Sequence, residues 1–124
     1  MKTLCSLPLV VGAWMLFAGC ALLTPHSGPK AVAGNWHNDL GTVWMVHPDG
    51  TFDVDLNKDG KRDAWGHYTV AGNTITIIEE GRMAEKCRKG VYHFTRTSDA
   101  LRFQLVSDHC KLRIQNVLKE WHKA

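Results

Sequence analysis

The sequence has 124 residues, 44% of them hydrophobic, and a formal net charge of +3. This length fits one domain, and a charge so near balance, with no run of Lys and Arg, argues against a nucleic-acid-binding protein. We therefore expect no nucleic-acid partner.

The beginning of the chain has the features of an export signal. Lys2 gives a positive start, and the run from Leu4 to Ala18 is almost wholly apolar and carries no charge. That run is shorter than the ~20 residues of a membrane-spanning helix but suits the hydrophobic region of a secretory signal. Residues 1–19 are therefore predicted to be a signal peptide and are excluded from the fold.

The end of this signal, Phe17-Ala18-Gly19-Cys20, resembles the lipobox of bacterial lipoproteins. The resemblance implies cleavage before Cys20, diacylglycerol on its sulfur and an acyl chain such as palmitate on its amine. Several acyl chains anchor a protein stably, so the predicted location is the bacterial cell envelope, with the outer membrane preferred to the inner. Phe17 stands where Leu is commoner, and the alternative is an ordinary cleaved signal that leaves a soluble secreted protein.

The next segment, residues 20–33, has the composition of a linker. It contains Pro25, Gly28 and Pro29 and shows no hydrophobic period, which predicts a flexible tether that begins at lipidated Cys20. The folded domain is predicted to cover residues 34–124.

Two cysteines remain for this domain. Cys5 leaves with the signal and Cys20 carries lipid, so Cys87 and Cys110 are predicted to form a disulfide in an oxidising compartment. A bridge that closes a loop of some 23 residues would contribute ~3 kcal/mol by the chain-entropy estimate. A redox or metal-binding thiol pair is the alternative, but the close C-x-x-C spacing is missing.

From Gly34 onward the chain has the pattern of short strands joined by tight turns. In the hairpin 66–77, Tyr68 and Val70 share one face with Ile75 and Ile77 across a turn. Further strands are predicted at residues 34–38, 41–47, 51–56, 90–96 and 101–105. Short connections between so many strands predict a mainly β fold, a small up-and-down antiparallel β-barrel.

The C-terminal segment has helical spacing instead. Its apolar residues fall at Cys110, Ile114, Val117, Leu118 and Trp121. Asp108 is well placed as an N-cap. We predict a short helix here, followed by a final strand near Trp121.

The ordered motifs resemble those of small bacterial lipocalin-like lipoproteins. They are Gly34-x-Trp36, Gly66-x-Tyr68-x-Val70-x-Gly72-Asn73, Cys87-x-x-Gly90-x-Tyr92, Leu101-x-Phe103 and Asp108-x-Cys110-x-x-Arg113. The resemblance covers most of residues 34–121 and implies a calycin-type barrel whose interior often holds a small apolar ligand. It also implies structural roles for Gly34 and Trp36 in the first strand, with Arg113 packed over the Trp36 ring.

Two hypotheses for the barrel interior are open. Lipocalins are longer than this chain, and an eight-stranded barrel is only just wide enough to fill with side chains or to hold one small ligand. A bound ligand is expected among Trp44, Phe52, Tyr68, Tyr92 and Phe103. If inward rings fill the core instead, the protein is a structural or interaction module of the envelope. A cavity of ~300 Å³ or more with an open mouth would favour the ligand carrier.

The sharpest local motif is Asp55-Leu-Asn57-Lys-Asp59-Gly60-Lys-Arg-Asp63. Oxygen ligands at alternate positions before a Gly turn suit a hard cation, and the pattern is similar to the calcium loops of integrin-type propeller blades. The ligands would be the side chains of Asp55, Asn57, Asp59 and Asp63 and the backbone carbonyl of Lys61. Calcium would then stiffen the module. The alternative is a solvated turn whose carboxylates are neutralised by neighbouring Lys and Arg side chains.

No catalytic residue is predicted. The sequence has no nucleophile elbow, no phosphate-binding glycine loop and no carboxylate pair placed by the pattern in an apolar pocket. Its seven histidines show no metal-ligand spacing, and His67 and His93 lie opposite the apolar face of their strands. We therefore expect a protein that is not an enzyme.

Overall fold

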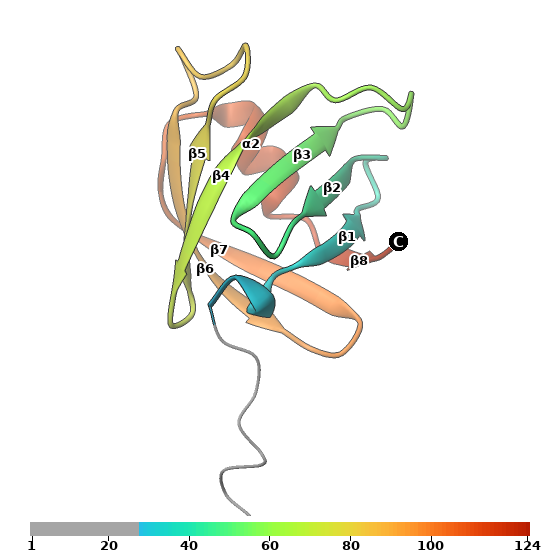
Figure 1. Ribbon diagram of the computed structural model, residues 1–124, viewed down its shortest axis with the longest axis vertical. Helices are drawn as coiled ribbons and strands as arrows, with labels where there is room; N and C mark the ends of the chain where they lie inside the picture. Colours follow the sequence, from blue (N-terminus) through green and yellow to red (C-terminus); the bar gives the residue numbers. More distant parts are fainter. Residues whose placement is uncertain (1–27) are drawn as a thin grey trace, which may run out of the picture.

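The computed structural model describes residues 28–124, so the predicted signal peptide and the lipidation site Cys20 lie outside the described residues. Within residues 28–124 the strands form one closed barrel, preceded by a 3-10 helix and interrupted by an α-helix (Figure 1). The elements are η1 (Gly28–Ala31), β1 (Gly34–His37), β2 (Val43–Val46), β3 (Thr51–Asp55), β4 (Ala64–Ala71), β5 (Thr74–Glu79), β6 (Lys89–Arg96), β7 (Ala100–Asp108), α2 (Lys111–Val117) and β8 (Trp121–Lys123).

Each strand pairs in antiparallel fashion with the next, and β8 returns to β1. The closing ladder places Trp36 opposite Lys123, and β7 joins β8 with Leu101 opposite Trp121. Closure removes the open edges that a flat sheet would present. The predicted up-and-down barrel with a short C-terminal helix is therefore confirmed.

Alternating burial explains how these strands form. Ile75 and Ile77 of β5 are buried, and the register places Tyr68 of β4 opposite Ile77, on the same inner face. Gly66 in β4 has a specific role, because a Cβ at that position would lie 2.0 Å from the carbonyl oxygen of Ile78. Only glycine allows the two backbones to approach so closely there.

Aromatic side chains fill the middle of the barrel. Trp44 packs against Trp121 with a ring-centroid distance of 5.2 Å and against Phe103 at 5.5 Å. Phe103 in turn contacts Tyr92 at 6.3 Å and Phe94 at 6.4 Å. Each such ring buries 150–250 Å², so this cluster dominates the core, and the inward direction predicted for Trp44, Tyr92 and Phe103 is confirmed.

One end of the barrel, called the lower end from its place in Figure 1, is closed by η1. Ala31 and Val32 both belong to the hydrophobic core, and the Val32 carbonyl oxygen accepts the indole N–H of Trp36 at 2.9 Å. The tether predicted for residues 20–33 is therefore wrong at its C-terminal end. A Pro- and Gly-containing stretch forms a 3-10 turn there, because its apolar residues gain burial by packing into the barrel.

The opposite, upper end carries the β3–β4 and β5–β6 loops together with α2 (Figure 1). The β1–β2 loop is tied to α2, since Asn38 Nδ2 donates to the Asn116 carbonyl oxygen at 3.3 Å. The predicted final strand is present as β8. The N-cap of α2 is Cys110 rather than Asp108, because the Asp108 carboxylate is engaged in an ion pair. No helix among residues 28–124 is both long and apolar enough to cross a membrane.

Candidate functional site

A disulfide and a buried ion pair hold the upper end together. Cys87 in the β5–β6 loop bonds to Cys110, directly before α2, which confirms the predicted disulfide. Arg113 of α2 donates to both carboxylate oxygens of Asp108, at 2.6 and 2.8 Å, and to the Cys87 carbonyl oxygen at 2.7 Å. The Asp108 side chain is 0% exposed and that of Arg113 is 11% exposed. This bidentate geometry fixes α2 against the end of β7.

Two further residues of the predicted motifs complete this network. The Tyr92 hydroxyl donates to the Asp108 carboxylate. Gly90 leaves room for the ion pair, because a Cβ there would lie 2.5 Å from Asp108 Oδ2 and 2.9 Å from Arg113 Nε. The motif from Cys87 to Tyr92 and the motif from Asp108 to Arg113 therefore form one structural unit.

The network holds each of its groups in one protonation state. Burial acts to raise the pKa of Asp108, but the hydrogen bonds from Arg113 and Tyr92 outweigh it and keep that pKa below its ordinary value. Burial acts to lower the pKa of Arg113, and the Asp108 carboxylate more than compensates, so the pKa is raised. Burial and the neighbouring Asp108 also raise the pKa of Tyr92. The arrangement is suited to bracing the fold, not to exchanging protons near neutral pH.

The predicted contact between Arg113 and Trp36 is replaced by a different one. The Arg96 guanidinium lies over the Trp36 ring, 5.2 Å from its centroid, and donates to the Ala31 carbonyl oxygen at 3.1 Å. Gly34 lies beside the same ring, since a Cβ there would be 3.3 Å from Trp36 Nε1. Arg113 cannot take this place because α2 holds it at the upper end, whereas β6 ends beside η1.

A small cavity lies under α2 at the upper end, with a volume of about 60 Å³. Its mainly apolar wall includes Trp44, Phe52, Val54 and Ala64 of the barrel, Leu56 and Met83 of two loops, and Leu112 of α2. The cavity is partly open to the surface, and Leu112 in its wall is 40% exposed. Sites for drug-sized ligands measure roughly 300–1,000 Å³, so this space is much smaller than a carrier's pocket.

The predicted ligand-binding residues are divided between this cavity and the packed core. Trp44 and Phe52 line the cavity. Tyr68 and Tyr92 use their hydroxyls in hydrogen bonds elsewhere, and Phe103 packs within the aromatic cluster. Neither the cavity under α2 nor a larger, more open hollow of about 590 Å³ beside the β3–β4 loop unites these residues. In a barrel of short strands, rings of this size occupy most of the interior.

One polar residue of the cavity wall is missing from the predicted set. Glu79 is 4% exposed, and its Oε2 accepts the backbone N–H groups of Trp65 at 3.2 Å and Gly81 at 3.1 Å. Burial raises the pKa of Glu79 in spite of these bonds. A signal for this position exists in the sequence, since Glu79 continues the alternation of Ile75 and Ile77 and so falls on the inner face.

The indole N–H of Trp44 also distinguishes the cavity. Trp44 is 3% exposed, and its Nε1 is a buried side-chain atom with no hydrogen-bond partner among the described residues. Trp36 and Trp121 each donate instead to the carbonyl oxygen four residues earlier, Val32 and Val117 respectively. Buried indole N–H groups usually find an acceptor, so Trp44 departs from the pattern of the other two.

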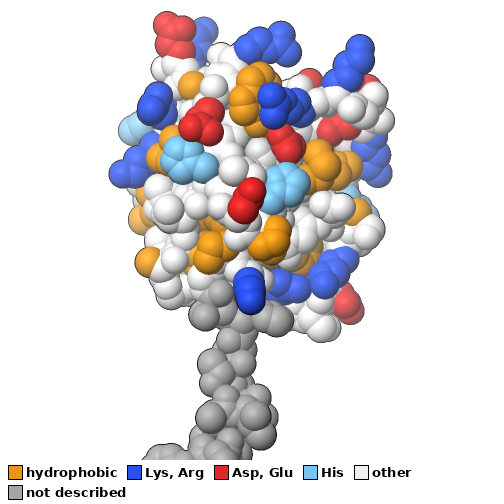
Figure 2. Space-filling view, in the orientation of Figure 1, with side chains coloured by type: hydrophobic (Ala, Val, Ile, Leu, Met, Phe, Trp, Pro, Cys, Tyr) orange, Lys and Arg blue, Asp and Glu red, His pale blue; other side chains and the backbone are white. Residues whose placement is uncertain are grey.

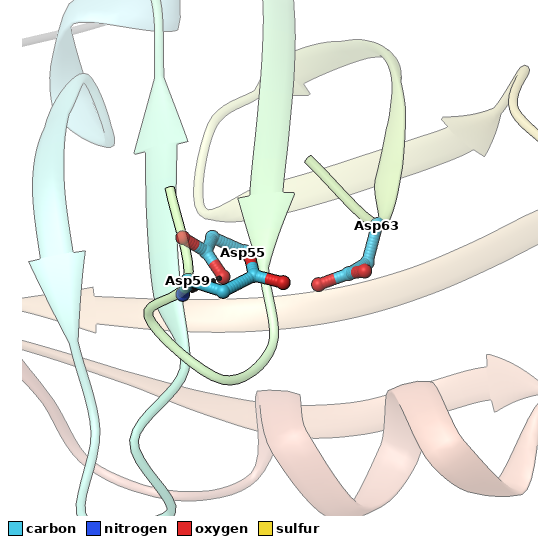
Figure 3. A group of neighbouring side chains, drawn as sticks. All are labelled: Asp55, Asp59 and Asp63. Carbon is cyan, nitrogen blue, oxygen red and sulfur yellow. Dashed lines mark hydrogen bonds between the residues drawn. The ribbon is translucent and has the colours of Figure 1, made fainter. Parts of the chain in front are cut away.

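The carboxylates of the predicted cation loop converge at the β3–β4 connection, where Asp63 points toward Asp55 and Asp59 (Figure 3). One oxygen from each of these three residues lies within 4.8 Å of the others. Asn57 lies beside them, and its amide nitrogen, after rotation of the group, would donate to Asp55 at 3.1 Å. The Lys61 backbone joins the loop through its N–H, which donates to Asp59 at 2.9 Å. The three carboxylates suit Ca²⁺, whereas Asn57 and Lys61 present N–H donors in this arrangement and not the oxygen ligands predicted for them.

Backbone donors already satisfy part of this negative charge. Asp55 accepts the N–H of Gly60 at 2.8 Å, and such bonds hold its pKa below the ordinary value although burial acts to raise it. Arg62 pairs with Asp53 at 3.1 Å and stacks on Trp65 at 4.1 Å. The ion pairs that Lys and Arg form within residues 28–124 do not include the three carboxylates. Calcium binding stays a prediction, and the loop without metal is a hydrogen-bonded turn.

The histidines predicted to lie outside the barrel do so. His67 and His93 are exposed, and His67 contacts Glu80 at 3.1 Å. The group of metal-type ligands that the structure brings together in residues 28–124 is the aspartate cluster. No catalytic residue was predicted, and the absence of enzymatic activity stays a prediction.

Comparison of the chain with protein-family models, with curated proteins and with solved structures finds no match. An eight-stranded barrel serves many unrelated functions, so the fold alone does not assign this chain to the lipocalins. The resemblance to lipocalin-like lipoproteins stays a prediction.

Proposed function

We propose that the protein is a lipid-anchored module of the bacterial cell envelope that presents its surface to a partner protein and does not carry a small ligand or catalyse a reaction. The observation that supports this is the filled interior. The cavity under α2 measures about 60 Å³, well below the ~300 Å³ at which pockets for small molecules begin.

The closed ends of the barrel support the same proposal. Val32, directly after η1, reaches the core at the lower end with 0% exposure, and Val117 of α2 is 5% exposed at the upper end. A ligand larger than the cavity under α2 would therefore have to displace one of these elements to enter. The bond between Cys87 and Cys110 opposes movement of α2 away from the β5–β6 loop.

Carriage of a small apolar ligand is the second candidate. It is favoured by the presence of Trp44 and Phe52, two of the predicted ligand residues, in the wall of the cavity. The cavity would have to expand several-fold to enclose such a ligand. Interiors packed at crystal-like density resist an expansion of that kind.

Native mass spectrometry of the full chain purified from its own host tests both candidates. We expect a mass increase from acyl groups that is lost in Cys20→Ser, together with release of the variant from the membrane fraction. We expect no further small molecule on either protein. A stoichiometric apolar ligand that persists on the Cys20→Ser variant would reject the module and support the carrier.

A further inference from the structure

The cavity under α2 has the size of a side chain. By the measure used for a single water, about 10–15 Å³ of space is needed, so 60 Å³ accommodates a group of several atoms. Its wall includes Leu56 of the β3–β4 loop, Met83 of the β5–β6 loop and Leu112 of α2, none of them fully buried, and we call the surface at these three residues the upper mouth. Leu56 and Met83 are half-buried and Leu112 is exposed. An apolar side chain entering from outside would gain burial against all three.

Trp44 provides a second, independent observation. Its indole N–H is buried without an acceptor, in a residue that lines the cavity. An entering group that carries an acceptor would therefore be favoured over a pure hydrocarbon. Methionine is both apolar and an acceptor, because its side chain is slender and unbranched and its thioether sulfur accepts hydrogen bonds weakly.

The charge around the upper mouth indicates which charge a partner should carry. The three segments that contribute Leu56, Met83 and Leu112 are residues 56–63, 80–89 and 109–120. Their exposed basic side chains are Lys58, Lys61, Arg62, Arg82, Lys86, Arg88, Lys89, Lys111 and Lys119. Their exposed acidic side chains are Asp59, Glu80 and Glu85, and those of Asp63 and Glu120 are half-buried. Figure 2 shows Lys and Arg side chains along this end of the molecule, with acidic side chains among them. The excess of positive charge suits an acidic partner.

We propose that the upper mouth docks an acidic segment of a partner protein and receives one apolar side chain of that segment, methionine above others, in the cavity. This inference rests on the proposed function, whose partner it describes by its chemistry. The inserted side chain would be the central anchor of the interface, and the basic residues would form its polar rim.

Synthetic nonapeptides test the proposal on the full chain in neutral detergent. The first peptide has a central methionine flanked by Asp and Glu, the second has alanine in place of the methionine, and the third has the methionine flanked by Lys. Fluorescence anisotropy of the labelled peptides measures binding. The alanine peptide is expected to bind at least about tenfold more weakly than the first, because it leaves the cavity unfilled. The Lys-flanked peptide is expected not to bind, and raising the salt should weaken the first peptide.

Two protein variants locate the binding site. Ala64→Leu adds side-chain volume inside the cavity and should abolish the difference between the methionine and alanine peptides. Lys111→Glu changes an exposed side chain beside Leu112 and should weaken the first peptide, whereas the matched charge reversal Lys30→Glu at the lower end should not. Because Lys111 is exposed, this pair keeps the test valid even if Ala64→Leu disturbs folding.

Equal affinity for the methionine and alanine peptides, or equal effects of Lys111→Glu and Lys30→Glu, would overturn the inference. Either result leaves the module proposal intact, since another surface could meet the partner. A bound small molecule in native mass spectrometry would reject the module itself. The two failures are therefore distinguishable.

Discussion

The lower end of the barrel is closed by packing, whereas the upper end is closed by bonds. At the lower end, Val32 enters the core and Arg96 covers the Trp36 ring, with hydrogen bonds to backbone carbonyl oxygens. At the upper end, α2 is fixed by a disulfide and by the ion pair of Asp108 with Arg113. The cavity under α2 lies at the upper end, beside the disulfide and the ion pair.

The comparison of the two ends explains how a small barrel can keep a surface that is able to receive a partner. Close packing leaves no space for a partner, because core side chains interlock at high density. A covalent and ionic brace fixes α2 without filling the volume under it. The upper end can therefore retain a small apolar cavity and exposed charges while the fold stays closed.

The largest expected effect comes from breaking the upper ion pair. Asp108→Asn leaves the Arg113 charge buried without its carboxylate, and we expect a loss of about 3–5 kcal/mol in the free energy of unfolding. Urea denaturation at neutral pH measures it. The matched control is Glu120→Gln, which removes an exposed pair with Arg102 and should cost less than about 1 kcal/mol.

The pH dependence of the same pair has a definite sign. Because the pKa of Asp108 is lowered in the folded protein, its stabilisation is present above the ordinary Asp pKa and is lost as the pH falls through the folded value. The wild type should therefore lose this stabilisation during acid unfolding, whereas Asp108→Asn, which has no carboxylate at this position, should not show the loss. An equal acid sensitivity of both proteins would show that Asp108 is not ionised in the folded state.

Removal of the disulfide should have the next largest effect. The double variant Cys87→Ser, Cys110→Ser frees a loop of 23 residues, for which the chain-entropy estimate is ~3 kcal/mol. Urea denaturation of the oxidised wild type and of this variant gives the difference. Dithiothreitol should destabilise the wild type and leave the variant unchanged, and an effect on both would point to another cause.

At the lower end, Arg96→Ala tests closure by packing. The variant loses the contact with the Trp36 ring and the hydrogen bond to Ala31, which together are worth about 1–2 kcal/mol. Thermal unfolding, with exposed Arg82→Ala as the control, measures the change. A cost as large as that of Asp108→Asn would contradict the distinction between the two ends.

Calcium offers a smaller effect at the β3–β4 loop. If the aspartate cluster binds Ca²⁺, a tenfold excess of the ion over its Kd stabilises the fold by about 1.4 kcal/mol. A melt with and without chelator detects this shift, which Asp59→Ala should remove and Asp99→Ala, in the β6–β7 turn, should not. An unchanged melting temperature in saturating Ca²⁺ would eliminate the site.

The smallest effect concerns Glu79. Because burial raises the pKa of Glu79 in the folded protein, the contribution of this group to the free energy of unfolding is complete below the ordinary Glu pKa. That contribution is lost as the pH rises through the pKa of the folded state. Glu79→Gln cannot ionise, so its stability should fall less than that of the wild type over this range. Melting temperatures at pH 4 and pH 7 compare the two proteins. A wild type that gains more stability than the variant on going to pH 7 would refute the assignment.

Local pattern was sufficient to predict most of the barrel. Tyr68 and Ile75 each lie between polar residues, and such alternation admits only one burial pattern in a strand. The pattern also predicts that Leu105 shares the buried face of Phe103, yet Leu105 is 45% exposed. A register shift at Val91 and Tyr92 disturbs the ladder beside it, and such irregularities leave no clear mark in sequence.

The candidate sites were less predictable than the strands. The convergence of Asp55, Asp59 and Asp63 follows from their spacing within one loop. The partner of Trp36 does not, because the resemblance implied Arg113, whereas the three-dimensional arrangement pairs Arg113 with Asp108 and places Arg96 over the Trp36 ring. The cavity and the unpaired N–H of Trp44 result from how several elements pack, and no single segment encodes them.

Residue type and spacing alone were sufficient to predict the alternation that forms the strands, the pairing of Cys87 with Cys110 and the acidic loop. Tertiary structure decided which cation covers Trp36, that η1 belongs to the core and that the interior is filled except under α2. The physical reason is that packing depends on contacts between segments distant in the sequence. The space that remains unfilled depends on all of these segments together.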